Sequence, residues 1–495
     1  MKKYVCVHGH FYQPPRENPW LERVEQQPSA YPFHDWNERI DAECYGPNAR
    51  ARILDGERRV VDVINVYARI SFNIGPTLLS WMEDHARRTY ASILEADEQS
   101  RACFGGHGSA IAQVYAHPIL PLASEIDRRT QVAWGVADFR HRFGRDPEGM
   151  WLPETAADLP SLEALAAAGI AYTILAPDQC AATRAPDETV LTPTSKRRVD
   201  TRRAYKVELP SGRSIAVFFY DGPTSRAVAF EQLLHDGARF ADRLVAGVRD
   251  GAGLAHIATD GETYGHHHRH GEMALAWALD AIERGGEVEL TNYGQFLEMH
   301  PPTWTATIVE PSAWSCAHGV GRWSRDCGCR MGGGSDQAWR GPLRTAFERM
   351  REAIDPLYAQ QASELLIDPW AARDAYIAVV LDRARETVDA FLRTHARRPL
   401  DEKEVPRALA LLEMQRNAML AFTSCGWFFD QVDGLEPAQV MAYAMRAAEL
   451  AGRFDAVGVE PALLRDLEAA HSRQPGAITG REVVEEVIAV AVSGI

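Results

Sequence analysis

The stretch "GLAHIATDGETYG", residues 253–265, decides the fold class because an apolar β-strand pattern ends there at a polar loop. The run "LAHIAT" predicts a strand, and Asp260 follows it directly. The same order, an apolar run and then a polar side chain, occurs at three other places: His8 and His10 follow "YVCV", Glu154 ends "GMWLPE", and Asp221 follows "IAVFFY".

Helical patterns lie between these strand runs. Examples are "SEIDRRTQVAWGVADFRHRF", "SLEALAAAG" and "FEQLLHDGARFADRLVAGV", in which apolar residues recur at three- and four-residue spacing. Strands that alternate with helices predict an α/β fold with a parallel sheet, either a barrel or a doubly wound sheet. In both, ligands bind at the carboxyl ends of the strands. Four polar loops converge more easily in a barrel, so we expect a (β/α) barrel over residues 1–302.

The pattern changes near residue 303. A passage rich in glycine, cysteine and tryptophan, "PSAWSCAHGVGRWSRDCGCRMGGGSDQAW", has no periodicity and predicts a junction over residues 303–335. After it, nearly all patterns are helical, which predicts a helical bundle domain over residues 336–495.

Composition excludes several classes of protein. The chain has 495 residues, of which 46% are hydrophobic and 24% are charged, which predicts a soluble globular protein with a large core. A net charge of −15 disfavours nucleic acid and anionic membranes as partners. The apolar run at residues 4–7 is too short for a secretion signal, and no segment reaches the roughly 18 apolar residues of a membrane span. With eight sparse cysteines, which fit reduced thiols, we expect a cytoplasmic protein.

Glu154 and Asp260 form the first candidate pair. Two carboxyls at neighbouring strand ends can face each other, and a separation of roughly 5 to 5.5 Å suits retaining glycoside chemistry. The alternative is that both are loop salt-bridge or helix-cap residues.

The histidines allow a second interpretation. His8 and His10 share one face of a strand, and with Asp260 and His266 to His270 they could form a catalytic zinc site. Histidines that donate hydrogen bonds to sugar hydroxyls explain the pattern equally well, and we expect no metal there.

Cys316, His318, Cys327 and Cys329 are four residue types that could hold a structural zinc. The C-x-C spacing is tighter than that of the common zinc patterns, which favours reduced thiols in a glycine-rich loop. The "GGHG" segment at residues 105–108 is a weak nucleotide signal, since no phosphate-loop lysine follows. No cofactor is therefore expected.

Aromatic residues beside these loops also suit sugar binding, because a ring face with a polar tip matches a pyranose. They include Trp36, Trp151 and Tyr264. Trp427, in "TSCGWFFDQVDG", could turn from the bundle towards the barrel, with core burial as the alternative.

Five segments in order, "HGHFYQP", "GGHGSAIAQ", "GMWLPE", "ATDGETYG" and "ELTNYGQFL", resemble the conserved regions of glycoside hydrolase family 57, whose members act on α-glucans with retention. The resemblance covers residues 1–300. It implies an incomplete (β/α)7-type barrel followed by an α-helical bundle that packs on the active-site face. The remainder resembles the poorly characterised helical domain of one subgroup.

The resemblance also implies roles. The glutamate that ends W-L-P-E, Glu154, would be the nucleophile, and the aspartate that opens D-x-E-x-x-G, Asp260, the general acid/base. The inserted "FY" before Gln13 and the run "HHHRH" depart from the family pattern. The complete set of expected substrate-binding residues is His8, His10, Gln13, Trp36, His107, Trp151, Asp221, Glu262, Tyr264, His266 and Trp427.

The predicted function is that of a retaining glycoside hydrolase or transglycosylase acting on an α-glucan or α-linked oligosaccharide. The alternatives are a metal-dependent carbohydrate deacetylase or mannosidase-like enzyme, and a glucan-binding protein without catalysis. The sequence specifies neither the glycosidic linkage nor the oligomeric state.

Overall fold

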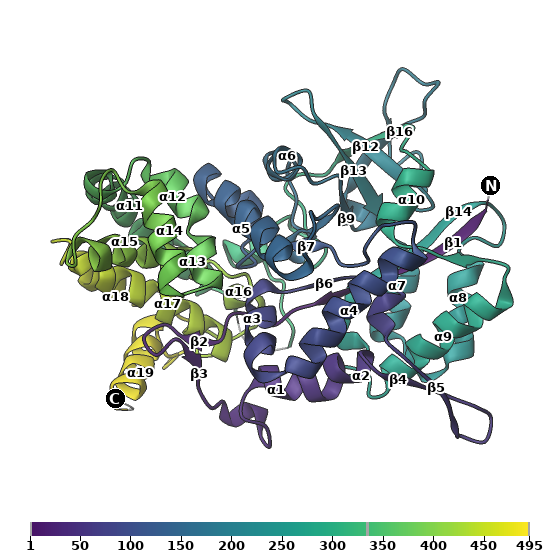
Figure 1. Cartoon of the computed structure of the whole chain (residues 1–495), viewed down its shortest axis with the longest axis horizontal. Helices are drawn as coiled ribbons and strands as arrows, with labels where there is room; N and C mark the ends of the chain where they lie inside the picture. The colour runs from purple at the N-terminus through teal and green to yellow at the C-terminus, as the bar shows by residue number, and fades with distance from the viewer. Residues whose placement is uncertain (1, 333–335, 494–495) are drawn as a thin grey trace. The chain divides into compact units, whose positions relative to one another are not determined.

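The computed structural model describes residues 2–332 and 336–493 (Figure 1). Its contacts divide the chain into two compact units. Unit 1 holds residues 2–13, 26–114 and 139–314, and unit 2 holds residues 14–25, 115–138 and the chain from residue 315 onward. The division after Trp314 falls inside the predicted junction. The two early segments of unit 2, residues 14–25 and 115–138, lie within the barrel domain that the sequence predicts as contiguous over residues 1–302.

Unit 1 contains a parallel barrel. Its strands are β1 (Lys3–Phe11), β6 (Ser71–Ile74), β7 (Ala112–Gln113), β8 (Met150–Trp151), β9 (Tyr172–Leu175), β13 (Ser214–Phe219) and β14 (Gly253–Asp260). Parallel ladders join β14 to β1, β1 to β6, β7 to β8, and β9 to β13. Parallel bridges from Phe72 to Ala110 and from Gly149 to Tyr172 complete the order. Because all these strands run in parallel, their carboxyl ends meet at one edge.

The barrel stays open between β13 and β14. In the described part of the chain no ladder joins these two strands, and a single hydrogen bond from the Asp221 N–H to the His256 C=O (2.9 Å) connects them. The predicted incomplete (β/α)7-type barrel is therefore confirmed.

Helices connect the barrel strands, as the alternating pattern predicts. They are α3 (Pro76–His85), α4 (Arg87–Cys103), α5 (Glu125–Phe143), α6 (Leu159–Ala167), α7 (Gly222–Phe230), α8 (Gly237–Ala246), α9 (Gly271–Gly285) and α10 (Tyr293–Met299). The single helix expected from "FEQLLHDGARFADRLVAGV" is wrong. Asp236 breaks it, because its carboxylate accepts the N–H groups of Ala238 and Arg239 and so starts α8 anew.

A second sheet extends from the barrel edge. It has the order β11 (Thr192–Pro193), β10 (Cys180–Arg184), β16 (Trp304–Ile308), β12 (Ala204–Glu208), β13 and β9. Residues 304–308, at the start of the predicted junction, are thus a strand, since "TATI" combines β-branched residues with alternate burial. The end of that junction, residues 333–335, lies outside the described residues. Short hairpins pair β2 (Glu17–Asn18) with β3 (Arg23–Val24) and β4 (Ala51–Leu54) with β5 (Val60–Ile64).

Unit 2 is helical, as predicted for the C-terminal part. Its helices after residue 336 are α11 (Arg340–Leu365), α12 (Pro369–Ala375), α13 (Ile377–Leu381), α14 (Arg385–His395), α15 (Glu404–Leu420), α16 (Cys425–Phe428), α17 (Leu435–Gly452), α18 (Val459–Leu467) and α19 (Gly480–Ser493). Residues 14–25 join them through the Glu17 carbonyl, which accepts hydrogen bonds from Tyr443 (3.0 Å) and Gln439 (2.8 Å). None of the described helices is long and apolar enough to cross a membrane.

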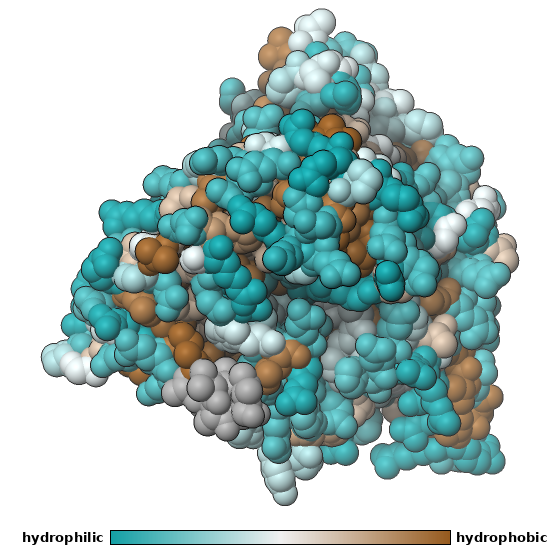
Figure 2. Space-filling model, turned by 60° about the vertical axis from the view of Figure 1, so that its left-hand side comes forward, coloured by the Kyte–Doolittle hydropathy of each residue, from teal (hydrophilic) through white to brown (hydrophobic). Residues whose placement is uncertain are grey.

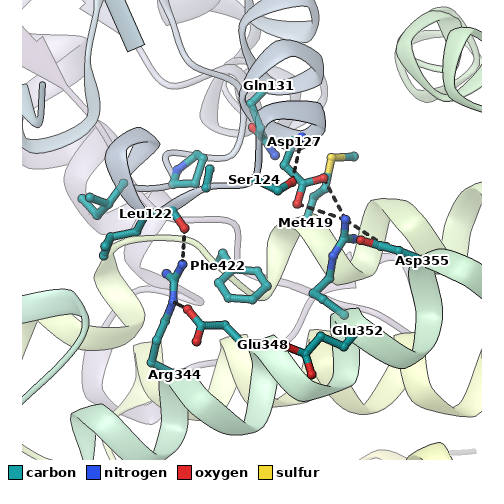
Figure 3. Close-up of a pocket in the computed structure, with 14 residues that line it drawn as sticks. Leu122, Ser124, Asp127, Gln131, Arg344, Glu348, Glu352, Asp355, Met419 and Phe422 are labelled. Atoms are coloured by element: carbon teal, nitrogen blue, oxygen red, sulfur yellow. Dashed lines mark hydrogen bonds and ion pairs between the residues drawn. The ribbon is translucent and has the colours of Figure 1, made fainter. Parts of the chain in front are cut away.

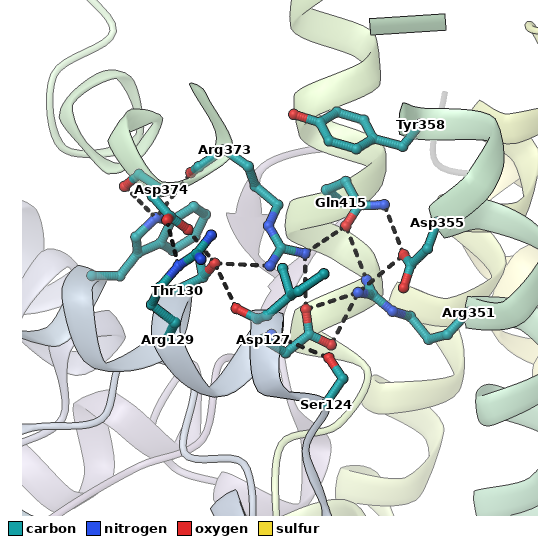
Figure 4. Close-up of polar contacts among 12 residues, drawn as sticks. Ser124, Asp127, Arg129, Thr130, Arg351, Asp355, Tyr358, Arg373, Asp374 and Gln415 are labelled. Atoms are coloured by element: carbon teal, nitrogen blue, oxygen red, sulfur yellow. Dashed lines mark hydrogen bonds and ion pairs between the residues drawn. The ribbon is translucent and has the colours of Figure 1, made fainter. Parts of the chain in front are cut away.

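A buried ionic network joins α5 to the later helices of unit 2 (Figure 4). The Asp127 carboxylate accepts hydrogen bonds from Arg351 (2.8 and 3.0 Å) and Arg373 (2.8 Å), and Arg373 also donates to Gln415 (2.8 Å). Burial would raise the pKa of Asp127, but the two guanidinium charges hold it below its ordinary value. Asp127 therefore stays ionised and fixes α5 within unit 2.

The face of the molecule shown in Figure 2 is mostly polar. Hydrophilic residues cover most of the face shown in Figure 2, with hydrophobic residues in small groups between them. Such a surface fits the net charge of −15.

Candidate active site

Two neutral histidines lie at the carboxyl end of β1. His8 bonds to Ser71 Oγ (3.0 Å) through Nδ1 and to Asn73 Oδ1 (3.1 Å) through Nε2, and His10 Nδ1 accepts from Asn73 Nδ2 (2.8 Å). Burial lowers the pKa of each imidazole to about 3. The bonding to Asn73 assigns the His10 proton to Nε2. Both rings are therefore neutral at physiological pH.

Asn73 is the centre of this network. Asn73 is the last residue but one of β6, and Gln113 is the last residue of β7. The Asn73 amide also donates to Gln113 Oε1 (2.7 Å). Polar side chains from three adjacent strand ends are thus joined in a line. The sequence analysis missed Asn73 and Gln113, whose signal is a polar residue at the end of "SFN" and "IAQ".

Trp151 supports both imidazoles. Its ring stacks on His8 and on His10, with centroids 4.9 and 5.0 Å apart, and Trp314 packs edge-on against it at 5.1 Å. Trp151 is fully buried, so it holds the histidine planes and does not offer a face to a ligand. This burial does not support the prediction that Trp151 binds the substrate.

Glu154 occupies a strained turn after β8. Its φ is 56° and that of Thr155 is 49°, both in the left-handed region that non-glycine residues rarely adopt. Such a conformation costs about 1–3 kcal/mol per residue and is typical of functional sites. The turn gives Glu154 a direction that an extended strand end would not.

Trp314 holds this turn from a distant part of the sequence. Its indole N–H donates to Glu154 Oε2 (3.0 Å), and its backbone N–H donates to the Glu154 carbonyl and the Thr155 hydroxyl (both 3.1 Å). A bridge between Ala157 and Ser312 keeps the two segments side by side. Trp314 was not among the predicted site residues, because its role depends on this tertiary contact.

Asp260 ends β14 in register with His10. Solvent reaches its side chain. Enough protein surrounds the carboxyl, however, that burial raises its pKa well above the ordinary value, and the charges of Glu262 and Glu154 raise it further. The neutral form of Asp260 is therefore favoured relative to an ordinary aspartate, and its carboxyl lies within electrostatic reach of Glu154.

Glu262 is buried beside this pair. Its carboxylate accepts from the Tyr45 hydroxyl (2.5 Å) and from the Tyr12 N–H (3.0 Å), and burial raises its pKa to about 7. Gln13, also predicted, is in the same loop and donates to the Tyr12 carbonyl (3.1 Å). The arrangement offers an accessible carboxyl with a raised pKa (Asp260), a carboxyl held in a fixed direction (Glu154), and a third whose pKa is about 7 (Glu262).

Several predicted residues have other contacts. Asp221 caps α7, because its carboxylate accepts hydrogen bonds from the N–H and the hydroxyl of Thr224 (3.1 and 2.7 Å). His107 bridges Glu148 (2.8 Å) and Glu298 (2.9 Å) near the amino ends of β7 and β8, the opposite edge from Asp260.

Three more predicted substrate-binding residues, Tyr264, Trp36 and His266, also contact other parts of the protein. Tyr264 is fully buried and accepts a hydrogen bond from the Thr259 hydroxyl (3.1 Å), as a core residue does. Trp36 and His266 are half-buried, with ring centroids 6.0 Å apart, and His266 bonds to Glu43 (2.5 Å). They form a pair in the loops of unit 1.

Trp427 lies in the core of unit 2. Its indole N–H donates to the Arg340 carbonyl (3.1 Å), and its ring packs on Phe347 with centroids 5.7 Å apart. Full burial of the side chain favours the core alternative over sugar binding.

The geometry weakens the zinc alternative at the histidines. Both ring nitrogens of His8 are engaged, one with Ser71 and the other with Asn73, so His8 has no nitrogen left to coordinate a metal. The carboxyl pair carries the candidate chemistry.

A separate pocket lies in unit 2 (Figure 3), with a cavity volume of about 340 Å³. Its charged side chains pair with one another: Arg344 donates to Glu348 (2.7 Å) and to the Leu122 carbonyl (2.5 Å), and Arg351 pairs with Asp127 and Asp355. None of the predicted site residues lines this pocket.

Models of known protein families match two parts of the chain. Residues 69–308 match the model of glycosyl hydrolase family 57, and residues 336–495 match a domain of unknown function (DUF3536). No curated protein sequence matches the chain.

Three solved structures have a similar fold. The exo-type maltose-forming amylase of Pyrococcus sp. ST04 has a TM-score of 0.69 at 16% identity, over 94% of this chain and 83% of that one. The branching enzyme of Thermococcus kodakaraensis has a TM-score of 0.58 at 15% identity, over 98% and 94%. The 4-alpha-glucanotransferase of Thermococcus litoralis has a TM-score of 0.55 at 15% identity, over 90% and 60%. Residues 69–308, the part of the chain that carries Glu154 and Asp260 on the barrel, therefore belong to glycosyl hydrolase family 57.

Proposed function

We propose that the protein is a retaining glycoside hydrolase or transglycosylase that acts on an α-glucan or α-linked oligosaccharide by double displacement. The observation that carries the proposal is the electrostatic coupling of the two predicted catalytic carboxyls, since the charge of Glu154 helps to raise the pKa of Asp260. Both follow barrel strands at the carboxyl edge, where ligands bind in such folds.

Glu154 is the nucleophile. Its carboxylate attacks the anomeric carbon while the protonated Asp260 donates to the leaving oxygen, and the glycosidic bond breaks as the glycosyl-enzyme bond forms. The Trp314 indole and the strained turn limit the directions in which Glu154 can point. A fixed direction lowers the entropy that must be lost before attack.

Asp260 then changes role. As a carboxylate it removes a proton from water, for hydrolysis, or from an acceptor hydroxyl, for transfer, and the oxygen so activated displaces Glu154 from the anomeric carbon. Because His8 and His10 stay neutral, no imidazolium stabilises the Asp260 carboxylate and its pKa remains high. The group can therefore serve first as acid and then as base.

The similar structures support the substrate class. They are a maltose-forming amylase, a branching enzyme and a 4-alpha-glucanotransferase, which favours an α-glucan for this chain too. We also propose a cytoplasmic location, because none of the eight cysteines forms a disulfide.

Azide rescue of two variants tests the assignment. Both Glu154→Ala and Asp260→Ala should lose turnover of an aryl α-maltoside. Azide should restore activity to each, with a glycosyl azide of inverted configuration from Glu154→Ala and of retained configuration from Asp260→Ala. Glu298→Gln, a carboxyl that pairs with His107, is the control and should keep full activity.

Product stereochemistry provides the contrary outcome. Proton NMR of the first product from wild-type protein should show the α-anomer before mutarotation. A β-anomer, or undiminished turnover by Glu154→Gln, would contradict double displacement through Glu154.

A further inference from the structure

We propose that unit 2 binds a structural zinc ion through Cys316, His318, Cys327 and Cys329. The sequence favours free thiols here because the C-x-H and C-x-C pairs are tighter than common zinc spacings. The structure nevertheless favours a metal site, because the chain between the two pairs turns back and brings all four ligand atoms within 4.8 Å of one another.

The distances are those of a tetrahedral site. Zinc with Zn–S bonds of about 2.3 Å separates two sulfurs by about 3.8 Å and, with a Zn–N bond of about 2.05 Å, separates sulfur from nitrogen by about 3.6 Å. Here Cys316 Sγ lies 3.9 Å from the sulfurs of both Cys327 and Cys329, and Cys329 Sγ lies 3.5 Å from His318 Nδ1. One ion at the centre would reach all four atoms with little movement.

The backbone around the ligands is shaped for this cluster. Gly328, between the last two cysteines, has a φ of +83°, which lets both thiols point to one centre. A Cβ on Gly321 would lie 3.1 Å from Cys327 Cβ, so a larger residue would crowd the ligand. The Arg322 N–H also donates to Cys316 Sγ (3.4 Å), the type of contact that orients a zinc thiolate.

Charge gives an independent argument. Arg322 and Arg340 are both buried beside the cluster, and Arg340 donates to the Cys329 carbonyl (2.7 Å). Arg340 has Asp430 at 3.9 Å, but no carboxylate of the described residues pairs with Arg322. The two positive charges of zinc against three thiolates leave one net negative charge, which would compensate the second buried guanidinium.

The ligand set selects the metal and the role. Three thiolates and one imidazole suit zinc, and four protein ligands leave no position for a substrate, so the site is structural. The ligand segment has a single 3-10 turn, Gly321–Trp323, as regular structure. Through Arg340, at the start of α11, and through the Arg322 bond to the Phe428 carbonyl (3.0 Å), zinc would fix this segment to two helices.

Metal analysis of the purified full chain is the first test. Inductively coupled plasma mass spectrometry should find one equivalent of zinc per chain after dialysis against a weak chelator. A mercurial thiol reagent should release this zinc, which a colorimetric zinc indicator then detects. X-ray absorption should fit three sulfurs at about 2.3 Å and one nitrogen at about 2.0–2.1 Å. An equivalent of iron, a disulfide within the cluster, or metal-free protein with free thiols would overturn the proposal.

Variants separate this site from the other thiols. Cys327→Ser should lose zinc and lower the thermal midpoint of unit 2, whereas His318→Cys should keep one equivalent with a fourth sulfur. Cys103→Ser, which changes an exposed cysteine of unit 1, is the control and should keep the metal. Zinc content unchanged in Cys327→Ser would overturn the assignment. Glu154→Gln should keep its zinc, so the zinc measurement remains a valid test even if the catalytic proposal fails.

Discussion

Replacing Glu262 by glutamine removes one of the two charges that raise the pKa of Asp260. Glutamine has nearly the same shape, and its amide oxygen can still accept from the Tyr45 hydroxyl and the Tyr12 N–H. The change therefore alters charge and leaves the loop in place. Of the two carboxylates, Glu262 contributes more than Glu154 to the raised pKa of Asp260.

The expected magnitude follows from the electrostatics. A like charge at close range shifts a carboxyl pKa by about one to two units, or about 1.4–2.7 kcal/mol. Losing the Glu262 charge favours the Asp260 carboxylate, so the pKa of Asp260 falls. The alkaline limb of kcat/KM reports loss of the essential acid in the free enzyme, and it should move to lower pH by about one to two units.

The assay is a pH profile of kcat/KM with an aryl α-maltoside. Since the pKa of Glu262 is about 7, Glu262 is itself protonated well below that pH, and the wild-type and variant rates should coincide in the acid range. Glu298→Gln serves as the charge control. An alkaline limb that stays in place or moves to higher pH would refute the assignment of Asp260 as acid.

Two further changes test the fold around the sites. Asp127→Asn should lower the free energy of unfolding of unit 2 by about 3–5 kcal/mol, because the two arginines bonded to Asp127 lose their shared carboxylate, and a thermal midpoint within a degree of wild type would contradict this. Gly261→Ala should lower the free energy of unfolding by about 1–3 kcal/mol and reduce activity, because the new Cβ overlaps the Phe11 ring beside Asp260. Gly285→Ala is the control and should leave both unchanged, because the space around Gly285 is open. Equal effects of the two changes would contradict this reasoning.

The sequence predicts the barrel where a strand has an apolar run of its own. The four apolar runs in the sequence correspond to β1, β8, β13 and β14, with β1 and β14 the clearest. β7 has only Ala112 and Gln113 and forms because its neighbours supply the pairing. Local pattern likewise predicts one helix over 230–248, where the Asp236 cap makes a break. Local signals thus suffice for long elements and fail for short ones.

The site divides in the same way. Glu154 and Asp260 are predictable because each lies at the end of an apolar run in the sequence, whereas Trp314 reaches Glu154 across 160 positions of the chain. Asn73 is a single amide whose role appears only when β6 pairs with β1. The four zinc ligands show the same limit, since their spacing is misleading until the loop folds back.

The pairing of β1 has a consequence for synthesis. The first strand pairs along its length with β14, in register from Lys3 with Gly253 to His10 with Asp260. A ribosome that adds about 5–20 residues per second needs about 10 to 50 s to make the chain between these partners. During that time the apolar "YVCV" segment of β1 lacks its β14 partner, so its unpaired edge is exposed to other nascent chains. The residues that complete the catalytic edge are therefore among those most in need of chaperone protection before the barrel assembles.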